Sequence, residues 1–107
     1  MLDRLRSDIT AAIVPLQTIR TVDVAAFEAL VVTVERILVD NKSAEVLSKA
    51  LLKELNFTRK VVRNESVHHK THRAFLEHLA NKLDLYFDLL LLSETPDQRQ
   101  PGVPRII

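Results

Sequence analysis

Residues 43–94 read SAEVLSKALLKELNFTRKVVRNESVHHKTHRAFLEHLANKLDLYFDLLLLSE and contain two apolar stripes on either side of a polar segment. Members of each stripe are three or four positions apart, a spacing that puts them on one face of a helix. The first stripe is Leu47, Leu51, Leu55, Thr58 and Val62, and the second is Leu76, Leu79, Leu83, Tyr86 and Leu90. Between Arg63 and His72 the only apolar residue is Val67.

The polar segment either breaks the chain into a helical hairpin or lies within one continuous helix. A helix of about 50 residues is far longer than the mean of roughly 11–12. We therefore expect a hairpin, with one helix over about Ser43–Asn64 and another over about Thr71–Glu94. Ser43 and Thr71 are the expected N-caps, because their hydroxyls can accept from free N–H groups of a first turn.

Two more helices are expected before residue 43. The first carries an amphipathic pattern at Leu2, Leu5, Ile9, Ala12 and Leu16. Pro15 cannot donate a backbone hydrogen bond, so this helix should end or kink near residue 13. The second begins after Asp23, the expected cap, and is apolar over most of its circumference. Its main stripe is Val24, Phe27, Val31, Val34 and Leu38.

These patterns predict an all-α protein, a compact bundle of about four helices forming one domain over residues 1–94. Residues 95–107 contain Pro96, Pro101 and Pro104, which predict an extended C-terminal tail. Without cysteine there is no disulfide and no thiolate metal site, and a single glycine argues against phosphate-binding loops. No apolar run is long enough to span a bilayer. A cytoplasmic protein that uses no cofactor is expected.

Charge is unevenly distributed along the chain. Residues 59–73 hold five lysines and arginines against Glu65 alone, a net charge of +4. Residues 74–98 hold five acidic residues against Lys82, a net charge of −4. The basic segment 59–73 could bind RNA or another anion, could contact the acidic helix of a second copy, or could simply be solvated.

All four histidines fall between His68 and His78, which fits a surface cluster, a metal site or a catalytic site. The metal candidates are Glu65, His68 and His72. Glu65 and His68 have the Glu-x-x-His spacing of di-metal helical bundles, but such bundles need a second Glu-x-x-His, which is absent here. We therefore expect no metal.

The motif Arg63-Asn64-Glu65-Ser66-Val67-His68 resembles the arginine–polar–spacer–histidine signature of HEPN-type helical ribonucleases. The resemblance implies that Arg63 stabilises charge on a phosphate, that Asn64 orients the pair, and that His68 transfers a proton. His69 fits the looser spacing of the signature equally well. Members of that family are small all-α bundles that usually form dimers.

Two functions follow from the sequence, and it leaves open whether the protein is an enzyme. The first is a small non-catalytic interaction or regulatory module, which acts through protein–protein contacts. It would form a homodimer through the apolar faces of helices two and four, because a bundle of this size has little interior for so many apolar side chains. The alternative is a metal-independent endoribonuclease that uses Arg63 and His68.

Overall fold

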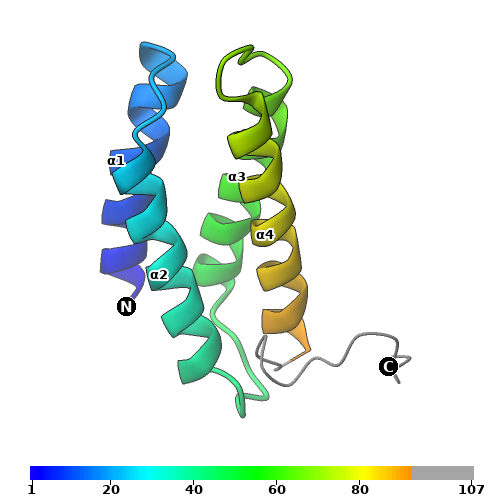
Figure 1. Ribbon diagram of the computed structural model, residues 1–107. Helices are drawn as coiled ribbons and strands as arrows, with labels where there is room; N and C mark the ends of the chain where they lie inside the picture. The colour runs from blue at the N-terminus through cyan, green and yellow to red at the C-terminus, as the bar shows by residue number, and fades with distance from the viewer. Residues whose placement is uncertain (93–107) are drawn as a thin grey trace, which may run out of the picture.

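The computed structural model describes residues 1–92, which form two antiparallel helical hairpins (Figure 1). The helices are α1 (Leu2–Thr18), α2 (Val24–Asp40), α3 (Lys49–Ser66) and α4 (Arg73–Leu91). The α1–α2 and α3–α4 turns lie at the same end of the bundle, and the α2–α3 connection lies at the other end. The all-α bundle of four helices is confirmed. The tail expected at residues 95–107 lies outside the described residues.

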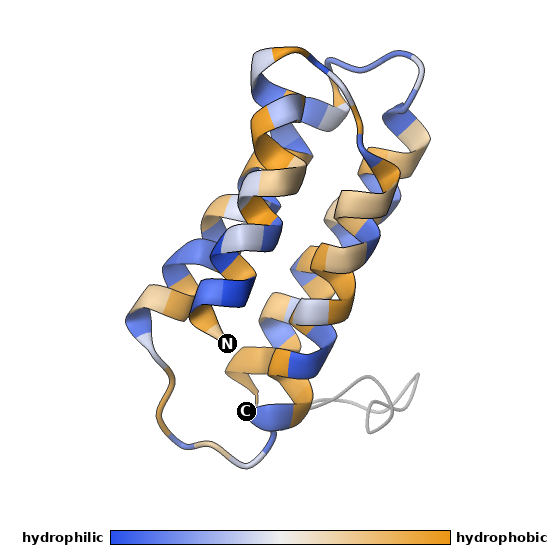
Figure 2. Ribbon diagram, turned by 90° about the vertical axis from the view of Figure 1, so that its left-hand side faces the viewer, coloured by the Kyte–Doolittle hydropathy of each residue, from blue (hydrophilic) through white to orange (hydrophobic). Residues whose placement is uncertain are grey.

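The core forms where the apolar stripes of the four helices meet (Figure 2). All five members of the second predicted stripe are buried on α4, and four of the first are buried on α3. The fifth, Leu47, packs against the core from just before α3. The fully buried Phe, Leu and Ile side chains come from α1, α2 and α4, including Leu5, Phe27 and Leu76, and α3 contributes the smaller Thr58 and Val62.

The polar segment breaks the chain, as the hairpin interpretation predicted. α3 ends at Ser66 and α4 begins at Arg73, so the continuous helix is wrong. Val67 and His68 are exposed at the turn. With so little apolar surface to bury there, nothing in the core favours continuing the helix. The expected Thr71 cap is also wrong, because His72 is the N-cap of α4 and makes no side-chain capping bond.

The expected start of the third helix at Ser43 is wrong by six residues. Ser48 caps α3 instead, and its Oγ accepts from the N–H of Leu51 at 3.3 Å. Residues 41–43 form a turn in which the N–H of Ala44 donates to the Asn41 carbonyl. Both serines precede apolar residues at helical spacing. The side-chain chemistry of the cap therefore could not predict which of the two serines begins the helix.

Pro15 does not end the first helix near residue 13, because α1 continues to Thr18. A proline ring holds φ at a helix-compatible value, but it removes one backbone hydrogen bond and crowds the carbonyl four residues earlier. The turn that follows Pro15 is nevertheless well held in the helix. Leu16 is fully buried, the Thr18 hydroxyl donates to the Val14 carbonyl at 2.7 Å, and the N–H of Ile19 donates to the Pro15 carbonyl at 3.1 Å.

α2 begins as predicted, because Asp23 Oδ1 accepts from the N–H of Ala26 at 3.1 Å. The helix is apolar on more faces than the bundle covers. Val24, Val32 and Val39 stay exposed, although most of the chain's other valines on helices are at least partly buried. Over residues 1–92 no helix is both long enough and apolar enough to cross a membrane.

Candidate functional site

Arg63 and Asn64 of the predicted catalytic motif lie in the last turn of α3. Arg63 extends across to α4, where its Nη2 donates to Asn81 Oδ1 at 2.8 Å and to Asp84 Oδ2 at 2.7 Å. The guanidinium is therefore held by an amide and a carboxylate of the next helix. About half of its side chain is shielded from solvent.

Arg63 and Asn64 line a pocket of about 270 Å³ between α3 and α4. We call it the polar pocket, and its lining residues are Arg59, Lys60, Arg63, Asn64 and Asp84. Arg59 lies one turn before Arg63, and its Nη1 is 3.3 Å from Asp84 Oδ1. The two guanidiniums thus each contact a different oxygen of one carboxylate.

The histidine candidates lie beyond the end of α3. His68 is exposed in the turn, and it is not among the residues that line the polar pocket. His69, its alternative, is only 8% exposed, and its Nε2 is 3.6 Å from Glu65 Oε2. The structure therefore brings Arg63 and Asn64 to one pocket, directs His69 into the protein and leaves His68 in solvent.

Glu65 sits at the centre of a polar cluster, at the end of the bundle where both hairpin turns lie, that joins the buried His69 to the exposed Arg20. Its Oε2 is 3.6 Å from His69 Nε2 and 3.6 Å from Nη1 of Arg20, which follows α1 with a positive φ of 51°. Neither Glu65 Oε2 nor His69 Nε2 has a hydrogen-bond partner within residues 1–92. In that same part of the chain, no three His, Asp or Glu side chains gather closely enough to hold a metal ion. The metal candidates Glu65, His68 and His72 thus form no such group.

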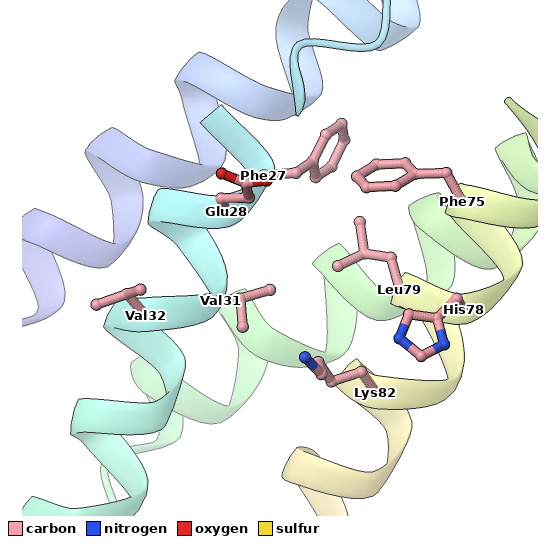
Figure 3. A pocket seen from close by; sticks show the side chains of 8 residues that line it. All are labelled: Phe27, Glu28, Val31, Val32, Phe75, His78, Leu79 and Lys82. Carbon is pink, nitrogen blue, oxygen red and sulfur yellow. The ribbon is translucent and has the colours of Figure 1, made fainter. Parts of the chain in front are cut away.

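A second, largely apolar pocket of about 260 Å³ opens between α2 and α4 (Figure 3). We call it the α2–α4 groove, and its lining residues are Phe27, Glu28, Val31, Val32, Phe75, His78, Leu79 and Lys82. The rings of Phe27 and Phe75 meet edge to face, with centroids 6.1 Å apart and planes at 70°. Such aromatic pairs are favourable beyond the area that they bury.

The groove carries opposite charges on its two walls. The negative Glu28 lies on the α2 wall, and the positive Lys82 lies on the α4 wall, where His78 is its neighbour in the lining (Figure 3). The exposed Val32 continues the apolar lining onto the surface of α2, and the partly exposed Leu85 does so beside a shallow neighbouring pocket on α4. Of the predicted apolar stripes of helices two and four, Phe27, Val31 and Leu79 line this groove, whereas most other members are buried in the core.

One hydrogen bond ties α2 to α4 beyond the groove. The hydroxyl of Tyr86 donates to Glu35 Oε2 at 2.6 Å. Burial raises the pKa of Tyr86 well above its usual value, and the hydrogen bond to Glu35 and the negative charge of that carboxylate raise it further. Tyr86 is therefore a neutral donor throughout the physiological pH range.

Sequence reasoning identified the basic residues of the polar pocket but missed Asp84 as their partner. The spacing of the polar residues along the two helices could have indicated this pairing. Arg59 and Arg63 are four apart on α3, and Asn81 and Asp84 are three apart on α4, so each pair shares a helix face. An antiparallel hairpin brings such faces together. The Phe27–Phe75 contact has no comparable signal, because it joins residues 48 positions apart.

Comparisons with known protein families, with curated proteins and with solved structures found no match to this chain.

Proposed function

We propose that this chain is a small, non-catalytic interaction module that pairs with a second copy of itself through the α2–α4 groove. One observation carries the proposal, namely the groove's apolar floor bordered by a negative wall and a positive wall. Fully burying a valine or leucine that was exposed is worth roughly 1.5–3 kcal/mol. The exposed Val32 gives a second copy such surface to cover, since Val32 is 64% exposed.

The charges of the groove fit a symmetric pair. A twofold axis along the groove places α2 of each copy against α4 of the other, as isologous contacts require. Glu28 of one copy then faces Lys82 and His78 of the second copy, and the same contact occurs twice. Complementary charges at a rim favour one orientation over others more than they add affinity.

The test is molar mass as a function of concentration, measured by light scattering during size-exclusion chromatography. The chain has a mass of 12.2 kDa, and we expect the measured mass to rise toward twice that value as the concentration increases. Val32→Asp should keep the protein at the monomer mass. The matched control is Val46→Asp, because Val46 is 86% exposed and lies before α3, away from the groove.

A charge exchange tests the orientation. Glu28→Lys and Lys82→Glu should each weaken pairing about tenfold, which corresponds to roughly 1.4 kcal/mol, and the double variant should restore it. The proposal fails if the wild-type mass stays at one chain at every concentration. It also fails if Val32→Asp and Val46→Asp associate equally well.

Cleavage of RNA is the second candidate function, and its support is that Arg63 and Asn64 share a pocket with Arg59 and Lys60. Guanidiniums suit phosphate groups, and a histidine titrates near neutrality. If this function holds, the purified protein cleaves RNA in the presence of a chelator, and Arg63→Ala and His68→Ala each abolish cleavage. Cleavage that both variants retain would come from a contaminant or from other residues and would exclude this assignment.

A further inference from the structure

The polar pocket is preorganised by one carboxylate that two arginines share. Asp84 accepts from Arg59 through Oδ1 at 3.3 Å and from Arg63 through Oδ2 at 2.7 Å. Two like charges one helical turn apart would otherwise repel each other. Asp84 offsets that repulsion and holds both guanidiniums toward the same pocket.

Other contacts fix the arginines further. The Nε of Arg59 donates to Asn56 Oδ1 at 3.0 Å, and its guanidinium stacks over the ring of Phe87 at 4.6 Å. Arg63 Nη2 also donates to Asn81 Oδ1. Long side chains lose conformational entropy when they are immobilised at a binding site, and here part of that loss occurs on folding.

The polar pocket has positive charges and N–H donors that have no partner within residues 1–92. Its three cations face a single carboxylate, which leaves an excess of two positive charges. Lys60 has no ion-pair partner within residues 1–92, and over the same residues Arg59 Nη2, Arg63 Nε and Arg63 Nη1 have no acceptor. The amide of Asn64 lies in the same lining.

We infer that the polar pocket binds the terminal phosphate of a phosphomonoester. Such a group carries a charge of about −1.5 to −2 at neutral pH and presents three strong acceptor oxygens. It matches the excess of two positive charges better than a carboxylate or a phosphodiester, each of which carries one negative charge. The free donors of the two arginines, on Arg59 Nη2, Arg63 Nε and Arg63 Nη1, can each give an N–H group to a different phosphate oxygen, and such charge-assisted hydrogen bonds are strong.

This site is independent of self-association. Asp84 and Asn81 point from α4 toward α3, whereas Phe75, Leu79 and Lys82 border the groove shared with α2. Phosphate binding and pairing therefore use different sides of α4. Failure of one proposal leaves the other standing.

Calorimetric titration with inorganic phosphate at constant ionic strength tests the inference. We expect saturable binding that weakens about tenfold in Arg63→Lys and several-fold in Lys60→Ala, since one ammonium cannot contact Asn81 and Asp84 and also replace the free Nε–H and Nη1–H groups. Lys53→Ala is the control, because Lys53 is an exposed lysine of α3 outside the pocket. Lys60 is exposed and its side chain makes no hydrogen bond or ion pair within residues 1–92, and circular dichroism of each variant verifies folding.

A pair of RNA oligonucleotides identifies the source of the phosphate. Tighter binding of the oligonucleotide with a 5′-phosphate than of the same sequence with a 5′-hydroxyl, lost in Arg63→Lys, would point to an RNA end. Inorganic phosphate binding without binding of either RNA would point to a small phosphomonoester. The inference is overturned if inorganic phosphate does not bind, if both RNAs bind equally while phosphate fails to compete, or if Lys53→Ala weakens binding as much as Lys60→Ala.

Discussion

The two sides of α4 contact their neighbouring helices in different ways. Toward α3, two arginines and a carboxylate join the helices across their exposed rim, above the buried leucines of both. Toward α2, the contact rests on apolar side chains and on the Tyr86–Glu35 hydrogen bond, and a groove remains open. The α3–α4 pair is joined by a short turn, whereas α2 and α4 meet only through tertiary packing.

This difference shows where side chains of α4 and its neighbours have partners within the chain and where apolar surface stays exposed. On the α3 side the pocket that stays open is lined by charged and amide side chains. An open groove with Val32 exposed beside it leaves surface whose burial would still be favourable. The α2–α4 groove is therefore lined mainly by apolar side chains, and the polar pocket at α3–α4 by charged and amide ones.

The largest expected effect is on the packing at the floor of the groove. Phe27→Ala should lower the free energy of unfolding by about 3–5 kcal/mol, because Phe27 is fully buried and its removal leaves a cavity beside Phe75. Urea denaturation measures the change. Phe57→Ala is the control, since Phe57 is 49% exposed on α3, and it should cost far less. Equal losses would mean that the α2–α4 contact contributes no more than a surface residue.

A smaller effect is expected at the hydrogen bond that joins α2 to α4. Tyr86→Phe should cost about 1–2 kcal/mol at neutral pH, because it removes a donor to a carboxylate. The pKa of Tyr86 is raised in the folded state, so its contribution is complete below about pH 10, the ordinary value of tyrosine, and is lost as pH rises above it. Above about pH 10, the free energy of unfolding of the wild type should therefore fall by about 1.4 kcal/mol per pH unit.

This pH dependence can be read from a single chromophore. Tyr86 is the only tyrosine, and the chain has no tryptophan, so ultraviolet absorbance of the phenolate reports this residue alone. We expect the folded protein to delay ionisation well beyond pH 10 and the urea-unfolded protein to ionise near pH 10. The stability of Tyr86→Phe should fall less steeply over the same range. Ionisation of the folded protein near pH 10 would contradict the hydrogen bond to Glu35.

The helices were predictable because their cause is local periodicity. Leu76, Leu79 and Leu83 repeat at a helical spacing, and the polar stretch after Val62 interrupts it, so the hairpin could be read from the sequence. The ends of the helices were less predictable. Ser43 and Ser48 are chemically equivalent caps, and the full burial of Leu16 keeps α1 helical past Pro15. Tertiary contacts decide such ends.

The sequence indicated which charged residues form the site, but it did not indicate which of them pair with each other. The basic segment at residues 59–73 and the acidic residues after it were visible as charge runs, and a contact with another copy was one interpretation. Asp84 of the same chain instead forms ion pairs with two of those basic residues, Arg59 and Arg63. Likewise the motif spacing puts Arg63 and His68 close in sequence, yet the end of α3 at Ser66 leaves His68 in the turn and outside the polar pocket.

The smallest expected effect is on the ionic contact between α3 and α4. Asp84→Asn keeps the shape of the side chain but leaves Arg59 and Arg63 without their shared charge partner. Because these side chains are partly exposed, we expect a loss of only about 0.5–1 kcal/mol in low salt, and less in about 1 M salt, where exposed charges are screened. Urea denaturation at the two salt concentrations measures both values.

Glu77→Gln provides the matched control for this contact. Glu77 pairs with Arg73 at 2.8 Å within α4 and joins no two helices, so its removal should cost about 0.3–0.5 kcal/mol. A shared carboxylate should lose more than a simple surface pair, because it also offsets the repulsion between two cations. If Asp84→Asn and Glu77→Gln cost the same and respond equally to salt, Asp84 is an ordinary surface partner. The two arginines would then not be held in place for a phosphate, and the α3–α4 side would differ from the α2–α4 side only in the side chains that line its pocket.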